Sequence, residues 1–174
     1  DLGILKDNIR SIREGLSEST DILFVVKADA YGHGATEVAR AALEAGVRWF
    51  CVAYVEEALA LRRAGIREGR ILVLGVADPG DAADMLEHGV TPMVVSAEHG
   101  RDLSREAERS GGVLPVHVKV DTGMGRLGFH WNTAVRDMQP LFDGPGIRVE
   151  GLCSHFAAVE PAQPDRAGTQ ARRF

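Results

Sequence analysis

Short apolar runs rich in β-branched residues alternate along the chain with stretches of helical composition. The apolar runs predict six strands, at residues 22–27, 49–54, 71–75, 92–96, 113–120 and 147–154. Helices are predicted between them at residues 35–45, 55–64, 81–87 and 97–109, and a further helix at 2–16 precedes the first strand. A glycine closely follows each of the four later helices, which is the expected C-terminal stop.

The strand–helix alternation repeats every roughly 20–30 residues and therefore predicts parallel βα units. Such units form either an open doubly wound sheet or a (β/α)₈ TIM-type barrel. A barrel needs about 250 residues and eight units, so 174 residues would supply about six of them. An open six-strand sheet is the complete-chain alternative, but no Gly-x-Gly-x-x-Gly follows the first strand to support its dinucleotide-binding version. A start at Asp1 and an end at Phe174, inside a helix-prone stretch, favour an incomplete chain.

The amino-acid composition disfavours several classes of function. The net charge of −5 and the pI near 5.7 disfavour a nucleic-acid partner. No apolar run approaches the roughly 20 residues of a membrane helix, and the N-terminus lacks the features of a signal peptide. The two cysteines, Cys51 and Cys153, lie in apolar runs and indicate buried thiols in a reducing compartment. We therefore expect a cytoplasmic protein.

The first candidate for chemistry is Lys27, which directly follows five apolar residues. This position predicts a lysine at the carboxyl end of a buried strand, where parallel α/β folds carry their active sites. Partial burial would lower the pKa of the amine and make it a usable nucleophile or base. The alternative is a lysine whose side chain extends from the strand end into water.

The residues around Lys27 favour the catalytic interpretation. Positions 26–34 read Val-Lys-Ala-Asp-Ala-Tyr-Gly-His-Gly, and this run resembles the signature of alanine racemases for attachment of pyridoxal 5′-phosphate (PLP). The resemblance implies that Lys27 holds PLP as a Schiff base and acts as one of two catalytic bases. It also implies that Tyr31 contacts the cofactor phosphate. Gly32 and Gly34 would let the loop bend tightly, and His33 is expected to be satisfied by the backbone.

A second block lies at residues 117–129. Strand alternation places His117, Lys119 and Asp121 on one face, opposite three valines. By themselves, Lys119 and Arg126 could equally be a surface pair. The block resembles the Lys-x-Asp-Thr-Gly-Met-Gly-Arg-Leu-Gly-Phe motif of the same family. That resemblance implies that Arg126 contacts the phenolic oxygen of PLP and the substrate carboxylate, and that Lys119 is carbamylated and orients Arg126.

A third block ends the sixth predicted strand. A lone histidine such as His155 is more often structural than functional. Its surroundings resemble the family segment Gly-x-x-x-His-Phe-Ala, which implies that His155 lies against the PLP ring. Gln170 and the terminal Arg173-Phe174 also resemble the family, whereas Val159-Glu160 departs from it.

Together these motifs identify the chain as the front part of an alanine racemase barrel domain, spanning residues 1–174. The resemblance implies interconversion of L-alanine and D-alanine for peptidoglycan, by removal and return of the Cα proton. It further implies a homodimer, no metal, and a tyrosine as second base in a C-terminal β-domain that this sequence lacks. Tyr54 is not placed like that base. Residues 1–174 alone are therefore expected to be inactive.

Three alternatives stay open at the sequence level. The first is a serine or broad-specificity racemase of the same fold. The second is a non-catalytic PLP-binding barrel protein, although those proteins lack a Met-Gly-Arg-Leu-Gly block with a lysine seven residues before the arginine, as Lys119 precedes Arg126 here. The third is a fragment or scaffold without enzymatic activity.

Overall fold

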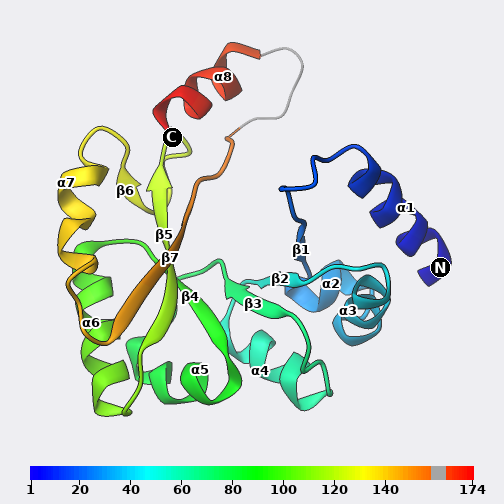
Figure 1. The fold of residues 1–174 in the computed structure, drawn as a ribbon, viewed down its shortest axis with the longest axis horizontal. Helices are drawn as coiled ribbons and strands as arrows, with labels where there is room; N and C mark the ends of the chain where they lie inside the picture. Colours follow the sequence, from blue (N-terminus) through cyan, green and yellow to red (C-terminus); the bar gives the residue numbers. More distant parts are fainter. Residues whose placement is uncertain (158–163) are drawn as a thin grey trace. The chain divides into compact units, whose positions relative to one another are not determined.

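The computed structural model describes residues 1–157 and 164–174, and these form two compact units (Figure 1). Unit 1 comprises Asp1–Ala77 and Glu87–Thr91, and unit 2 comprises Asp78–Leu86 and Pro92–Phe174. Strands and helices alternate within each unit, and the strands pair in parallel. The parallel α/β architecture predicted from the periodicity is therefore confirmed.

Unit 1 is built on three parallel strands with the order β1-β2-β3. The strands are β1 (Leu23–Val25), β2 (Trp49–Val52) and β3 (Arg70–Val73). The helices are α1 (Leu2–Glu14), α2 (Lys27–Gly32), α3 (Ala35–Glu44) and α4 (Val55–Arg63). Phe50 and Ile71 are fully buried and pair in register across β2 and β3. β1 is shorter than predicted and half-exposed, because it pairs with β2 alone in this unit.

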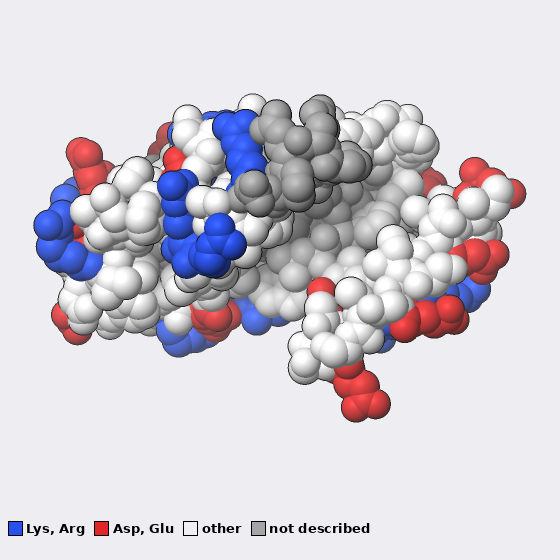
Figure 2. All heavy atoms as spheres, turned by 90° about the horizontal axis from the view of Figure 1, so that it is seen from above, with Lys and Arg blue, Asp and Glu red and all other residues white. Residues whose placement is uncertain are grey.

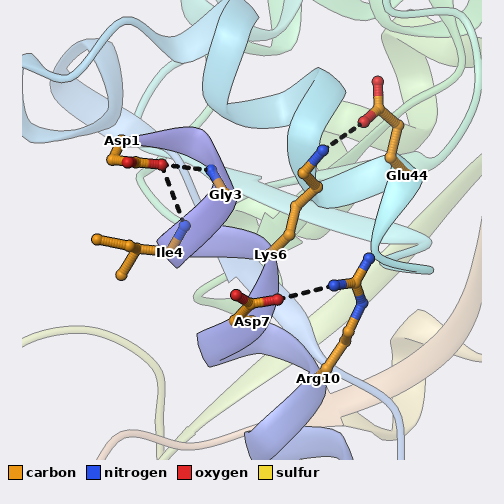
Figure 3. A network of polar contacts seen from close by, with 7 residues as sticks. All are labelled: Asp1, Gly3, Ile4, Lys6, Asp7, Arg10 and Glu44. Carbon is orange, nitrogen blue, oxygen red and sulfur yellow. Dashed lines mark hydrogen bonds and ion pairs between the residues drawn. The ribbon is translucent and has the colours of Figure 1, made fainter.

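Polar contacts fix α1 at its start and against α3 (Figure 3). The Asp1 carboxylate accepts hydrogen bonds from the backbone N–H groups of Gly3 at 2.7 Å and Ile4 at 3.3 Å, which caps the helix. Lys6 extends to Glu44 of α3 at 3.0 Å, while Ile9 is buried. The helix expected before the first strand is therefore confirmed and is a packed part of unit 1.

Unit 2 is organised around β5 (Leu114–Asp121), which pairs in parallel with three other strands. These are β4 (Val90–Val94), β6 (Phe129–His130) and β7 (Ile147–Cys153). The helical segments are η1 (Pro79–Asp81), α5 (Ala82–His88), α6 (Ala97–Arg109), α7 (Ala134–Met138), η2 (Gln139–Leu141) and α8 (Pro164–Arg173). The first residues of β4 and the last of α5 belong to unit 1. Because β5 is central, its carboxyl end is surrounded by other segments.

Helix α6 covers β5 and β7 in unit 2 (Figure 1). The Ser96 hydroxyl caps its N-terminus by accepting from the N–H of His99 at 3.1 Å. Gly100 permits close packing, since a Cβ there would lie 2.3 Å from Leu141 Cδ2. Ser104 accepts a hydrogen bond from the N–H of Gly146 at 3.0 Å. These contacts hold the segment that leads into β7 against the helix.

Several elements differ from the sequence prediction. β6 and α7, between the fifth and sixth predicted strands, were not predicted, because segments of two and five residues leave no measurable periodicity. The helical stops are confirmed: Gly46 and Gly65 adopt φ values of 90° and 88°, which other residues rarely reach. The expected departure at Val159-Glu160 lies outside the described residues.

The chain carries a net charge of −5. Figure 2 shows several basic side chains close together near the middle of the displayed face and several acidic side chains toward its right edge, so neither sign of charge covers this face. Within residues 1–157 and 164–174, no helix is both long and apolar enough to cross a membrane.

Candidate functional site

Lys27 lies just beyond the carboxyl end of β1, as predicted. Val26 links this point to the sheet, because it is buried and its N–H donates to the carbonyl of Cys51 at 2.8 Å. The chain has two other lysines. Lys6 is paired with Glu44, and Lys119 is buried with only 6% of its surface exposed. Lys27 is half-buried and has no carboxylate partner among the described residues, so it is the lysine best placed to react.

The residues after Lys27 form a left-handed turn. Ala28, Asp29, Ala30 and Tyr31 have φ values of 50° to 57° and ψ values of 36° to 51°. The glycines at positions 32 and 34 do not by themselves explain this bend, because the left-handed residues precede Gly32. Left-handed geometry costs roughly 1–2 kcal/mol per non-glycine residue, or about 4–8 kcal/mol for four. Surrounding contacts must therefore hold the turn in place.

Backbone and carboxylate contacts supply that support. The N–H of Ala30 donates to the carbonyl of Val26 at 2.9 Å. The Asp29 side chain accepts from the N–H of Ala35 at 2.7 Å, which joins the turn to the start of α3. Glu57 of α4 accepts from the N–H of Ala28 at 2.7 Å. Glu57 was not predicted as a site residue, although it lies three residues after Tyr54, the N-cap residue of α4, and this is the spacing at which a glutamate can reach back to a helix start.

Tyr31 and His33 occupy the end of the turn. Tyr31 is 61% exposed, and its ring centroid lies 6.0 Å from Lys27 Nζ. The ring is therefore near the amine, and most of this residue is accessible to a ligand. His33 Nδ1 is 3.0 Å from the carbonyl of Ala30, which confirms the expectation that the backbone satisfies this histidine.

In unit 2, the alternation along β5 confirms the predicted two faces. The face with His117, Lys119 and Asp121 is opposite the buried residues Val116, Val118 and Val120. Lys119 is itself buried, so it is not the surface lysine of the simpler interpretation. It is aligned with Cys153 of β7, and a Cβ at Gly128 would lie 2.7 Å from its Cγ. Burial raises the pKa of the Cys153 thiol, and the positive charge of Lys119 partly opposes that rise.

Asp121 organises the loop that carries Arg126. Its carboxylate accepts from the N–H groups of Gly123, Met124 and Gly125, at distances of 2.8–3.1 Å. Burial by itself would raise the pKa of Asp121, but these backbone donors together lower it below its ordinary value. The Arg126 side chain is exposed and forms no ion pair with the described carboxylates. A free guanidinium on a fixed loop can bind an anionic group.

We expect Asp121→Asn to destabilise the full-length protein by about 1–3 kcal/mol near pH 7, since one oxygen acceptor and the charge are lost. A lowered pKa in the folded state stabilises the fold above the pKa of the unfolded state, and this contribution disappears as pH falls through the lowered value. The gap between wild type and variant should therefore shrink in acid. Urea unfolding at several pH values measures it, with the exposed Asp143→Asn as control. A gap that does not change with pH would contradict this account.

A chain of hydrogen bonds connects the ends of β5 and β7 with α8. Ser154 Oγ donates to the carbonyl of Val120 at 2.9 Å. Each hydroxyl has one proton, so Thr122 must donate to Ser154 over their 2.7 Å contact. Buried Gln170 donates to Thr122 Oγ1 at 3.1 Å and to the carbonyl of His155 at 2.9 Å. This arrangement fixes the backbone at His155.

His155 lines a cavity of about 250 Å³ in unit 2. The cavity is lined by residues that directly follow β5 and β7, by two residues of α8 and by the residue after that helix, namely Thr122, Ser154, His155, Phe156, Gln170, Ala171 and Phe174. The predicted site residues thus fall into two groups. Lys27 and Tyr31 are together in unit 1, and Lys119, Arg126 and His155 are near the strand ends of unit 2.

Comparison with known proteins gives a consistent result. The family model described as alanine racemase, N-terminal domain, matches residues 1–174. Alanine racemase of Symbiobacterium thermophilum is 44% identical over 165 residues, which cover 94% of this chain and 43% of that protein. The chain therefore spans less than half the length of this curated relative.

Solved structures agree with the sequence comparison. Alanine racemase of Clostridium difficile 630, in complex with cycloserine, has a TM-score of 0.92 and 35% identity, covering 97% of this chain and 46% of that one. Histidine racemase from Leuconostoc mesenteroides subsp. sake has a TM-score of 0.90 and 28% identity, covering 99% of this chain and 46% of that one. The fold matches the corresponding part of these racemases.

Proposed function

The chain belongs to the alanine racemase family, since the model of that family's N-terminal domain matches residues 1–174, and on this premise we propose that the full-length protein interconverts L-alanine and D-alanine with PLP. The observation that carries the proposal is Lys27. It is half-buried beyond a strand end, has no carboxylate partner among the described residues, and directly precedes four residues with strained left-handed geometry. Strain of this kind is typical of functional sites.

The residues present fit PLP by their chemistry. Its aldehyde requires a primary amine, which Lys27 supplies, and its phosphate and phenolic oxygens require donors. Tyr31 provides an exposed hydroxyl and Arg126 an unpaired guanidinium. When bound, PLP makes the Cα proton of an amino acid acidic by delocalising the negative charge left behind.

We assign the following roles to side chains of this sequence. The Lys27 amine holds the cofactor and exchanges a proton with the substrate Cα on one face. Arg126 binds the phenolic oxygen of PLP and the substrate carboxylate through its fork of donors. Tyr31 binds the phosphate, and His155 packs against the ring. Lys119 is proposed to add CO₂ through its neutral amine, with release of a proton, and the resulting carbamate would orient Arg126. The burial of Lys119 without a described carboxylate partner supports this, because a buried ammonium group without a partner is costly.

The proposed active site also requires parts of the full-length protein that lie outside residues 1–174. Residues 1–174 form part of a PLP-binding (β/α) barrel, and a tyrosine from a C-terminal β-domain of the partner subunit in a homodimer serves as the base on the opposite face. The chain covers only 43–46% of the racemases compared above. Cys51 and Cys153 form no disulfide, which supports a reducing cytoplasmic location, where D-alanine would be supplied for peptidoglycan.

The second candidate function differs from the first in its amino-acid substrate. The similarity to a histidine racemase at a TM-score of 0.90 shows that this part of the fold is shared by an enzyme named for a different amino acid. A serine or broad-specificity racemase is the corresponding alternative. Alanine is preferred because the curated relative with 44% identity is named for it.

A racemisation assay of the full-length protein tests this proposal. With PLP added, L-alanine should lose optical activity at roughly 1–10³ turnovers per second, faster than L-serine or L-histidine under the same conditions. Residues 1–174 alone should show no racemisation, because one base cannot serve both faces. Faster turnover of serine or histidine would assign the protein to the alternative, and turnover by residues 1–174 alone would contradict the requirement for a second base.

A further inference from the structure

Glu57 joins three segments of unit 1 through one carboxylate. Its Oε2 accepts from the N–H groups of Ala53 at 2.7 Å and Tyr54 at 3.3 Å, where β2 leads into α4. Its Oε1 accepts from the N–H of Ala28 at 2.7 Å. The two oxygens therefore have different partners. Oε2 caps the beginning of α4, and Oε1 accepts from a residue 29 positions earlier in the chain.

The reach to Ala28 exceeds what a capping residue needs. Ala28 directly follows Lys27 and is the first residue with left-handed geometry. Its N–H points to Glu57 rather than to a backbone carbonyl, so this carboxylate fixes the beginning of the turn. Asp29, the next residue, joins the turn to the first residue of α3 by accepting from the N–H of Ala35. One carboxylate thus joins the turn to α4, and another joins it to α3.

We propose that Glu57 is a positioning residue for Lys27, acting through the N–H of Ala28. This inference rests on the proposed function, since it takes Lys27 as the lysine that binds PLP. Loss of the acceptor would leave the Ala28 N–H without its partner and allow the strained turn to relax. The direction of the Lys27 side chain depends on that turn, so the amine would spend less time in the reactive geometry.

The test compares Glu57→Gln with Glu56→Gln in the full-length protein. Glutamine keeps one carbonyl oxygen, which can still cap α4, but replaces the other acceptor with an NH₂ group. Glu56 is the exposed neighbour in the same helical turn and serves as the matched control. The cofactor-free proteins are mixed with PLP, the attachment to Lys27 is trapped with borohydride at timed intervals, and the modified peptide is quantified. Thermal unfolding of the same samples reports on folding.

For Glu57→Gln we expect covalent attachment at Lys27 to be about 10- to 100-fold slower, with thermal unfolding close to that of wild type and with Glu56→Gln unchanged. Attachment within twofold of wild type in folded Glu57→Gln would overturn the proposal. If Glu57→Gln does not fold, Glu57→Asp, which keeps the charge with a shorter reach, is judged by the same criterion. If attachment in wild type occurs at another lysine, the assignment of Lys27 fails, and this outcome is distinct from an unchanged rate at Lys27.

Discussion

Replacing Lys27 with alanine is expected to abolish measurable racemisation by the full-length protein, with a loss of about 10⁴-fold or more. The variant lacks the amine proposed to hold the cofactor and also the base for one face of the substrate. General acid–base catalysis alone contributes roughly 10²–10⁴-fold, and the covalent role adds to it. The fold should persist, because Lys27 forms no ion pair with the described carboxylates and Val26 anchors the strand end.

The loss is measured by chiral chromatography of alanine after incubation with enzyme and PLP. Lys6→Ala is the matched control, since it removes a lysine of α1 that forms a surface ion pair with Glu44 of α3. That control should retain wild-type activity, because exposed pairs contribute little to stability. Normal racemisation by the Lys27→Ala variant would contradict the proposed function.

Replacing Arg126 with alanine is expected to lower kcat/KM about 10²–10³-fold, the range for removal of a charge-stabilising donor at a reacting group. Stability should change by less than about 0.5 kcal/mol, because the side chain is exposed and unpaired among the described residues. Arg126→Lys should recover only part of the activity, since the lysine ammonium cannot replace the bidentate hydrogen bonding of the arginine guanidinium.

The matched control for Arg126 is Arg101→Ala, which removes an exposed arginine on α6. It should have wild-type kinetics and stability. Steady-state rates and urea unfolding, measured on the same preparations, separate an effect on catalysis from an effect on stability. Normal kcat/KM in Arg126→Ala, or a loss explained fully by unfolding, would exclude the proposed role.

The sequence was sufficient for the parallel α/β architecture and for the location of Lys27. The spacing of apolar residues and the glycines that end helices depend only on neighbouring positions in the chain, so both can be recognised in the sequence. The two-faced pattern of β5 was equally predictable, because side chains alternate along a strand regardless of the surroundings. For the same reason, Lys119 and Asp121 were correctly placed on one face.

The supporting contacts could not be predicted in the same way. The left-handed turn at residues 28–31 contradicts the local preference of alanine and tyrosine, and it is held by Asp29 together with Glu57 from a different helix. Contacts between segments 29 residues apart leave no periodic signal. The burial of Lys119 likewise depends on β7 and on the close approach of Gly128.

The most direct test of the central claim is to identify the lysine that binds PLP. The full-length protein is reduced with borohydride, digested, and the modified peptide is sequenced by mass spectrometry. Within residues 1–174 only Lys6, Lys27 and Lys119 could react, and we predict modification of Lys27 alone. Modification of Lys119, of Lys6, or of a lysine outside this segment would contradict the account.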